Sequence, residues 1–400
     1  MAWGSATQRD VVLEYERARG LSRAGSWCAL ESGGRLSWQA GELAAASGGG
    51  LVAQLCKFSG ARGSLPPVLL VHGASAWRGT FMEQDGGLLR HLLRSRDVWT
   101  LDWRASKVIT DRWRDVAPDA VPEDVRNMNL DLPAVRELPA AIEKVRDECG
   151  QTPDVLGHCM GAAIVAIALA RGTLASTPRR VVLSALGLFY RGTVDTWFRA
   201  DERLDAHALA PNGPWYLDFA SAADLPEPYQ RAFELWRKTP YLHCQVPFCQ
   251  RISAILGCPY RPDDIGYLHD VATHEGLATQ FGVMPTGILN HCARNVRRGW
   301  SAPYAGSRSV DRTDLQHPER FAQIDKLTLI TGAENQLWHR DSIDRMYEWL
   351  NRAPVWRRER QAVARLEKRV FDRFGHQDLF LSPLAAAAGS VYDYVLQRLS

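Results

Sequence analysis

The sequence lacks the features that mark several classes of protein. No apolar window approaches the roughly 20 residues of a membrane span. The eight cysteines include no Cys-x-x-Cys pair or paired metal spacing, and the chain has no internal repeat. The 48 Lys and Arg residues nearly balance the 45 Asp and Glu residues without a long basic run, so nucleic acid is not indicated as a partner. We therefore expect an ordinary soluble globular protein.

Two clusters and the N-terminus bear on cofactors and location. Cys244, Cys249 and Cys258, with His243 beside them, have irregular spacing and are separated by proline and aromatic residues. We expect neither a metal site there nor any cofactor. The basic stretch at 356–360 is interrupted by an acid, which is typical of a solvated surface, with an anion-binding patch as the alternative. The first residues contain no charged segment followed by an apolar stretch, so a reducing cytoplasm is favoured.

The most informative stretch is 154–163, a short apolar run that ends in Gly-His-Cys-Met-Gly and continues into an Ala-rich sequence. It predicts a strand, a sharp turn with Cys159 at its apex, and a helix. Glycines flank such an apex because the turn is strained and neighbouring backbone lies close. The helix N-terminus and a nearby imidazole would favour the reactive thiolate. A buried, unreactive cysteine in a Gly-flanked turn is the alternative.

Apolar runs and helical spacings alternate around this stretch. Runs without internal alternation are typical of strands buried on both faces, and strands that alternate with helices give a parallel sheet covered on both sides. The predicted class is α/β. We expect buried strands at 68–71, 98–102, 154–158 and 181–186, helices at 88–93 and 138–149, and antiparallel edge strands at 27–30 and 51–56.

The alternation stops after residue 186 and resumes near residue 321. The intervening segment, 187–320, is rich in aromatics and prolines, and a structureless loop of that length is improbable in a compact domain. We predict a first core part at 1–186, a mainly helical cap at 187–320 and a second core part at 321–400. The second part is expected to hold strands at 327–331 and 370–374 and helices at 342–350 and 383–399.

A cysteine nucleophile needs a base, and the base needs an orienting group. His376 follows the last predicted strand, at the sheet edge where the elbow strand also ends, so we predict that it is the base. Asn335 follows strand 327–331 and is the favoured orienting residue. Its carbonyl could accept the imidazole N–H, as in Cys-His-Asn sites, although an amide cannot stabilise imidazolium by charge. Glu334 is the alternative orienting acid, and Asp341 and Asp195 are weaker candidates.

Acyl transfer also needs donors for the negative charge on the former carbonyl oxygen. The N–H of Met160, directly after Cys159, is one expected oxyanion-hole donor. The His72-Gly73-Ala74 turn after the first buried strand supplies the other, which we assign to the N–H of Ala74. We expect His72 itself to be structural.

The order of these parts resembles the α/β-hydrolase superfamily over nearly all of residues 60–400. Cysteine replaces the usual elbow serine, a departure that resembles polyhydroxyalkanoate synthases and dienelactone hydrolases, and asparagine replaces the usual aspartate. The segments 68–73, 97–104 and 157–161 also look similar to hydrolase-like regions attached to cholesterol-oxidase-type flavoproteins, but no Gly-x-Gly-x-x-Gly flavin motif accompanies them. The resemblance implies the α/β-hydrolase fold, with a mostly parallel sheet and a cap, and covalent acyl-enzyme chemistry. It does not imply a substrate.

Three functions are compatible with this pattern. The favoured one forms an acyl-Cys159 thioester from a thioester or activated ester with a bulky apolar acyl group, and passes it to water, an alcohol or an amine, as in a thioesterase, cyclase or acyltransferase. The alternatives are ordinary ester or lactone hydrolysis and a catalytically silent binding protein. The expected partner is a small acyl substrate, free or bound to CoA or a carrier protein, for which Arg294, Arg297 and Arg298 are weak anion-binding candidates.

Overall fold

The computed structural model describes residues 24–31, 36–39, 51–60, 65–114, 116–121, 123–200, 215–219, 230, 234, 246–256, 274, 276–304, 315–357 and 365–400. Within these residues, nine strands form one sheet in the order β11-β10-β7-β6-β4-β5-β3-β1-β2. In chain order, the strands are β1 (Ala24–Glu31), β2 (Leu36–Gln39), β3 (Leu51–Phe58), β4 (Val68–Val71), β5 (Val98–Asp102), β6 (Asp154–His158), β7 (Arg180–Ser184), β10 (Lys326–Gly332) and β11 (Leu366–Phe371).

The sheet is parallel from β11 to β5, and β3 joins β5 in antiparallel orientation. Strands β4 and β5 are buried at every residue, as the uninterrupted apolar runs predict. The predicted antiparallel edge is confirmed, because β1 pairs with β3 and with β2 in antiparallel register. The short strand β2 was not expected from the sequence.

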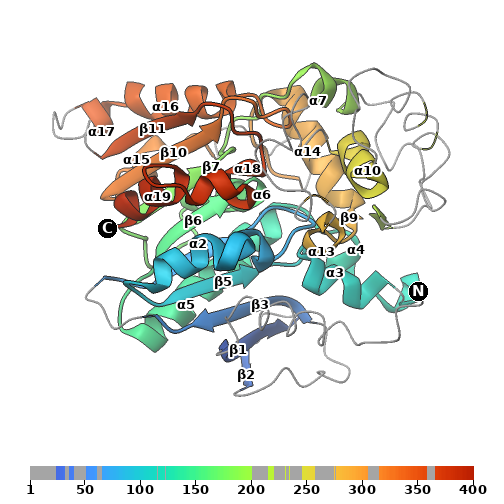
Figure 1. Cartoon of the computed structure of the whole chain (residues 1–400), viewed down its shortest axis with the longest axis horizontal. Helices are drawn as coiled ribbons and strands as arrows, with labels where there is room; N and C mark the ends of the chain where they lie inside the picture. The colour runs from blue at the N-terminus through green and yellow to red at the C-terminus, as the bar shows by residue number, and fades with distance from the viewer. Residues whose placement is uncertain are drawn as a thin grey trace.

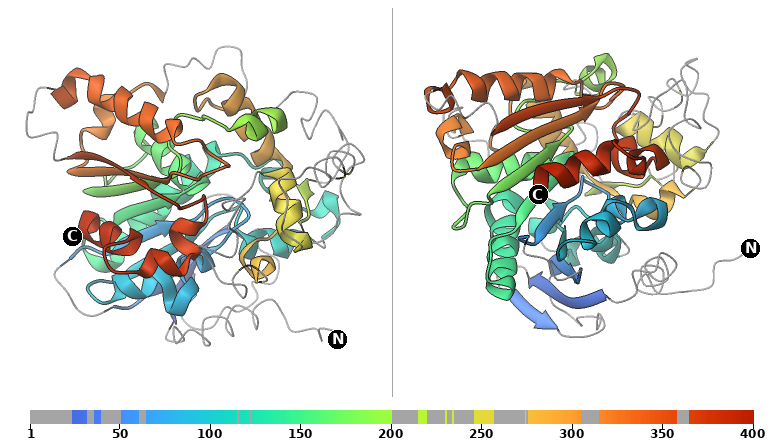
Figure 2. Two further views of the ribbon diagram at one scale, coloured as in Figure 1. Left: turned by 45° about the horizontal axis from the view of Figure 1, so that its top comes forward. Right: turned by 60° about the vertical axis from the view of Figure 1, so that its left-hand side comes forward.

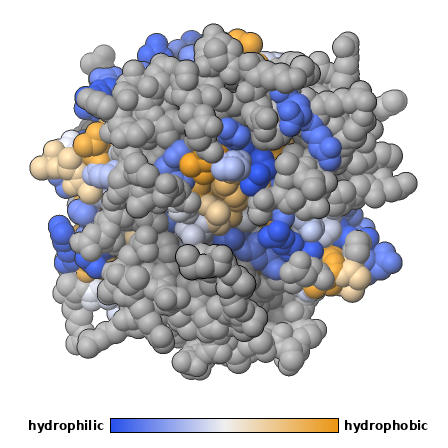
Figure 3. Space-filling view, turned by 45° about the vertical axis from the view of Figure 1, so that its right-hand side comes forward, coloured by the Kyte–Doolittle hydropathy of each residue, from blue (hydrophilic) through white to orange (hydrophobic). Residues whose placement is uncertain are grey.

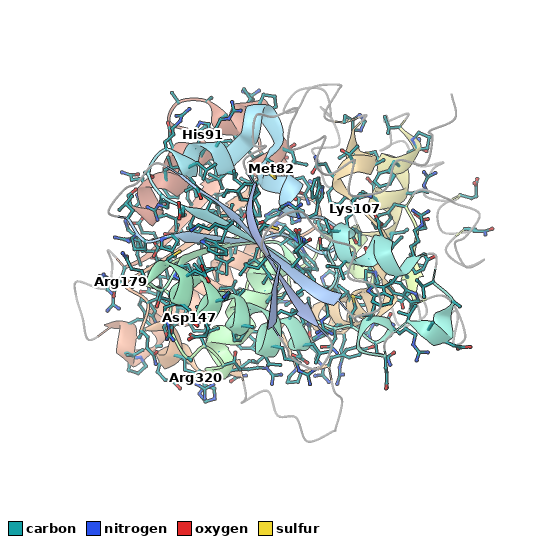
Figure 4. The ribbon with its side chains drawn as sticks, turned by 90° about the horizontal axis from the view of Figure 1, so that it is seen from below. Met82, His91, Lys107, Asp147, Arg179 and Arg320 are labelled. Carbon is teal, nitrogen blue, oxygen red and sulfur yellow. The ribbon has the colours of Figure 1, made fainter. Side chains whose placement is uncertain are left out.

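Helices cover both faces of the sheet (Figures 1 and 2). Helices α2 (Glu83–Leu93), α18 (Asp378–Leu381) and α19 (Val391–Leu399) pack on one face with the 3-10 segments η1 (Arg78–Phe81) and η7 (Pro383–Ala386). The other face carries α5 (Leu138–Cys149), α6 (Met160–Arg171), α15 (Pro318–Phe321) and α16 (Asp341–Arg352). Figure 4 shows His91 on α2 and Asp147 on α5 on opposite sides of the strands.

Shorter elements connect these layers. They are α3 (Lys107–Arg114), η2 (Pro118–Ala120), α4 (Glu123–Arg126), the π-helical turn η3 (Pro133–Glu137) and α17 (Pro354–Arg357). None of the described helices combines the length and hydrophobicity that crossing a bilayer requires.

The described elements from Val194 to Arg298 form a group of helices on one side of the molecule (Figure 1). They comprise α7 (Val194–Arg199), α10 (Pro247–Ile255), α13 (Leu277–Gln280) and α14 (Thr286–Arg298), with the two-stranded pair β8 (Tyr216–Leu217) and β9 (Met284–Pro285). The bounds of the cap at 187–320 stay a prediction. His243, Cys244 and Cys258 lie outside the described residues, and Cys249 is buried on α10. The described surface in Figure 3 has small hydrophobic patches among hydrophilic residues.

Two predicted boundaries near the C-terminus are wrong. The strand expected at 370–374 ends at Phe371, and Arg373 has φ 68°, which an extended strand does not accommodate. The single helix expected at 383–399 is divided into η7 and α19. Gly389, with φ 73°, lies between them, and a residue in this left-handed conformation cannot continue a right-handed helix.

Candidate active site

Cys159 occupies the strained apex between β6 and α6. Its backbone has φ 55° and ψ −123°, a combination that is unfavourable for a residue with a side chain. The flanking glycines permit this turn: a Cβ on Gly157 would lie 2.7 Å from Cα of Ala162, and one on Gly161 would lie 2.2 Å from the carbonyl oxygen of Val71. The two glycines therefore allow Cys159 to adopt this turn.

The Cys159 side chain is a neutral thiol. Only 6% of the residue is exposed. Burial raises the pKa of the thiol to about 12, although the indole N–H of Trp338 and the backbone N–H of Met160 act in the opposite direction. The prediction of a thiolate is therefore wrong for this state, because the donors around the sulfur do not offset the loss of water.

His376 lies between β11 and α18 and is fully buried. The turn that carries it is held by Asp378, whose Oδ2 accepts the backbone N–H of Gly375 at 2.7 Å. Burial lowers the pKa of His376 to about 3, so the imidazole is neutral. Its ring lies 4.8 Å from the ring of His158, the residue before the apex. Among the described residues, Nε2 of His376 has no hydrogen-bond partner. It therefore makes no hydrogen bond to Sγ of Cys159.

Asn335 contacts His376, but through the opposite end of its amide from the one expected. Nδ2 of Asn335 lies 3.1 Å from Nδ1 of His376. Oδ1 instead accepts the backbone N–H groups of Leu337 at 3.1 Å and Trp338 at 3.0 Å. The predicted carbonyl-to-imidazole contact is therefore wrong, because the turn after Asn335 occupies that oxygen.

The other candidate orienting residues lie elsewhere. No hydrogen bond joins the described side chains of Glu334 and His376. Asp341 is half-buried and pairs with His339 at 3.3 Å. The side chain of Asp195 lies outside the described residues. The orienting role stays a prediction for Asn335, which is the residue that the fold brings to His376.

The loop after β4 lies against the apex. A Cβ on Gly73 would be 3.1 Å from Cβ of Cys159, so the backbone passes the nucleophile closely, with the buried Ala74 next in the chain. This proximity is what an oxyanion-hole contribution from the Ala74 N–H requires. That role, and the role of the Met160 N–H, remain predictions.

Asp102, at the end of β5, holds the loop that follows β4. It accepts the backbone N–H of Arg78 at 2.9 Å, forms a buried ion pair with the Arg78 guanidinium, and lies 3.2 Å from Nε2 of His72. Burial by itself would raise the pKa of Asp102, but Arg78 and His72 outweigh it and hold the pKa at about 2. Nδ1 of His72 donates to the carbonyl of Gly73 at 2.6 Å, in keeping with its expected structural place.

Comparison with known proteins supports the fold. A family model described as the alpha/beta hydrolase fold matches residues 66–205. A soluble variant of monoglyceride lipase from Saccharomyces cerevisiae, in complex with a substrate analog, is 13% identical with a TM-score of 0.50, over 87% of this chain and 92% of that one. A thermostable carboxyl esterase from Bacillus coagulans, in complex with glycerol, is 12% identical with a TM-score of 0.50, over 87% and 94%. No curated protein matches the sequence.

The chain has the α/β-hydrolase fold. This confirms the predicted fold class, a mostly parallel sheet with helices on both faces. Structural likeness at such low identity reaches no further than the fold.

Several residues near the α/β-hydrolase elbow were not anticipated. Trp338 lies next to the Cys159 sulfur, and only 3% of this residue is exposed. Among the described residues, its indole N–H makes no hydrogen bond of ordinary geometry. Cys292, on α14, donates its thiol to Sδ of Met160 at 3.3 Å. His158 stands inside the motif and could have been suspected from its position. Cys292 lies in the insertion, where no sequence pattern fixed its distance from the elbow.

Two of the cap arginines are already engaged with backbone carbonyls. Arg294 donates to the carbonyl of Tyr304 at 3.0 Å, and Arg297 donates to that of Ala200 at 2.6 Å. Arg298 is exposed at the end of α14. Binding of an anionic acyl carrier by this group therefore stays a prediction with reduced support.

Proposed function

We propose that this α/β-hydrolase-fold chain is an acyl-transfer enzyme that forms a thioester on Cys159. The observation that carries the proposal is the placement of a cysteine at the strained elbow apex, beside the N–H of Met160. A strained, Gly-flanked apex is costly to maintain and is typical of a nucleophile that must be presented to a substrate. Nδ2 of Asn335 lies 3.1 Å from Nδ1 of His376, which supports the grouping of these two residues in the site.

The reaction begins when the Cys159 thiol loses its proton to solvent and its Sγ attacks the carbonyl carbon of a thioester or activated ester. A C–S bond forms, and the carbonyl electron pair moves to the oxygen, near the N–H groups of Met160 and Ala74. Collapse of this intermediate expels the leaving group with its electron pair. The acyl-Cys159 thioester is then attacked by an acceptor, which releases the Cys159 thiolate.

An uncharged, apolar acyl group suits this site. Burial holds both Cys159 and His376 in their neutral forms, so the surroundings disfavour charge. Among the described residues, aromatic side chains of the insertion pack against other aromatic rings, as Phe189 and Trp300 do at 4.2 Å. The support for a bulky acyl chain therefore comes from Trp338 beside the sulfur, rather than from the aromatic content of the cap.

Ester hydrolysis is the second candidate. The structural relatives named above include a monoglyceride lipase and a carboxyl esterase, so the same fold supports ester cleavage in other proteins. Hydrolysis and transfer share the acyl-Cys159 intermediate and differ in what attacks it. The experiment must therefore detect the intermediate and its fate separately.

Intact-protein mass spectrometry after incubation with a panel of acyl thioesters tests the proposal. The wild-type chain should gain the mass of one acyl group, and Cys159→Ala should gain none. Cys292→Ala is the matched control, because it removes a neighbouring thiol and leaves the apex intact, and it should still gain the acyl mass. No adduct and no turnover with any thioester or ester would leave the catalytically silent binding protein as the better account.

A further inference from the structure

The orientation of the Asn335 amide is fixed by its own turn. Two backbone N–H groups, from Leu337 at 3.1 Å and Trp338 at 3.0 Å, converge on one atom of the amide. An amide nitrogen has no lone pair available to accept them, so this atom must be the carbonyl oxygen. The amide nitrogen therefore faces His376 and Oγ1 of Thr331.

This orientation determines which nitrogen of His376 carries the proton. Nδ2 of Asn335 is a donor, and it lies 3.1 Å from Nδ1 of His376, so Nδ1 must accept. A neutral imidazole that accepts at Nδ1 carries its proton on Nε2. The imidazolium form is disfavoured as well, because its Nδ1–H would point at the N–H of the amide.

We propose that Asn335 holds His376 in the Nε2–H tautomer, so that acyl-Cys159 is passed to a thiol acceptor and not to water. Asn335 acts here as a positioning residue. The inference rests on the proposed acyl-transfer function and concerns the acceptor. In Ser-His-Asp triads, replacing the Asp by Asn produces this tautomer and lowers kcat by about 10⁴.

The tautomer discriminates between acceptors because they differ in how they lose a proton. Water must give a proton to a base as it attacks, and Nε2–H cannot accept one. A thiol is ionised to a few per cent near neutral pH and arrives as a thiolate without help from a base. Its sulfur forms the new C–S bond, the bond to Sγ breaks, and the Cys159 thiolate leaves with the electron pair. No proton changes place in this step.

Nitrogen NMR of the histidine-labelled wild-type chain reads the tautomer directly. The long-range proton–nitrogen spectrum should show His376 with Nε2 protonated and Nδ1 unprotonated, and His376→Gln identifies the signal. An Nδ1–H signal in the wild type would overturn the proposal. This measurement needs no substrate, so it decides the tautomer even if no acyl adduct forms and the proposed function fails.

Asn335→Asp reverses the polarity of the contact while keeping an oxygen for the two backbone N–H groups. His376 should then carry its proton on Nδ1, and hydrolysis of acyl-Cys159 should accelerate at least about 100-fold. The wild type should exchange its acyl group with a small thiol but hydrolyse it slowly. Equal hydrolysis rates in the wild type and Asn335→Asp, with an adduct present in both, would overturn the proposal.

Asn129→Asp is a matched control for this change. Oδ1 of Asn129 accepts the backbone N–H groups of Asp131 at 2.9 Å and Leu132 at 3.2 Å, the same local turn as at Asn335 without the histidine. The control should leave both the His376 tautomer and the rate of deacylation unchanged. A rate increase equal to that of Asn335→Asp would assign the effect to added negative charge and overturn the proposal.

Discussion

At the scale of single residues, the charge state of Cys159 makes the first prediction. Because burial raises the pKa of the thiol to about 12, the thiolate is the minor form at all moderate pH values. Its fraction should grow about tenfold for each pH unit. Alkylation of Cys159 by iodoacetamide should therefore accelerate without levelling off between about pH 7 and about pH 10.

Peptide mass spectrometry assigns the alkylated residue, and Cys159→Ala supplies the background from the other cysteines. A rate that levels off near pH 8 to 9, as for an exposed thiol of ordinary pKa, would contradict the buried neutral thiol. In Asn335→Asp, the alkylation rate of Cys159 should begin to rise at a lower pH if the new carboxylate stabilises the imidazolium form of His376.

Asp102 makes a second prediction, about stability. Its pKa is about 2 in the folded chain against 3.8 as the ordinary value, so the folded state favours the ionised form. This contribution, about 2 kcal/mol, is present above about pH 4 and is lost as the pH falls toward about 2. Asp102→Asn should therefore lower the free energy of unfolding most at neutral pH.

Urea titrations of the wild type and Asp102→Asn at several pH values measure this difference. At neutral pH it should reach about 3 to 5 kcal/mol, because the variant removes the carboxylate charge that faces the buried Arg78 guanidinium. The difference should narrow as the pH falls from about 4 to about 2, because the carboxylate of the unfolded wild type binds its proton first and that of the folded chain follows only near pH 2. A difference that does not change with pH would show that the carboxylate charge is not what stabilises this loop.

At the scale of elements, the next prediction concerns the glycines that flank Cys159 in the turn between β6 and α6. Gly161→Ala would place a Cβ 2.2 Å from the carbonyl oxygen of Val71, so β4 and α6 must separate. We expect a loss of more than about 3 kcal/mol of folding free energy. Gly150→Ala is the control: its φ of 71° strains a side chain, but nothing lies within 4 Å, so it should cost only about 1 to 2 kcal/mol. Thermal melting measures the loss of stability in both variants. Similar losses in the two would contradict a steric clash at Gly161.

The regular elements could be predicted from sequence because their signals are local. Uninterrupted apolar runs located β4 and β5, and the Gly-x-Cys-x-Gly pattern located the turn after β6. The short strand β2 and the break at Gly389 were missed, because pairing with β1 and a left-handed backbone residue leave little trace in apolar periodicity. The insertion was recognised only by the interruption of a regular pattern.

At the scale of the whole molecule, the contact of Asn335 with His376 could be predicted, but the chemistry at these residues could not. Parallel topology brings the ends of β6, β10 and β11 to one edge, which is enough to expect Cys159, Asn335 and His376 together. The ionisation of Cys159 depends on how completely the surrounding layers exclude water. The direction of the Asn335 amide depends on two backbone N–H groups, two and three residues further along the chain. Neither quantity follows from residue type and spacing.

The C-terminal helix stabilises the loop that carries His376, which makes the last prediction. Tyr392 on α19 is fully buried, packs against His91 at 5.2 Å, and donates its hydroxyl to the carbonyl of Phe380 on α18 at 2.7 Å. The Phe380 ring in turn lies 4.8 Å from His158.

Tyr392→Phe should cost about 1 kcal/mol of folding free energy through the lost hydrogen bond, and Tyr392→Ala about 3 to 5 kcal/mol through the cavity. Denaturant titration, with the Cys159 acylation rate measured below the melting range, should show the Ala variant slower and the Phe variant close to wild type. Equal acylation rates in all three chains would mean that the His376 loop keeps its position without the packing of α19.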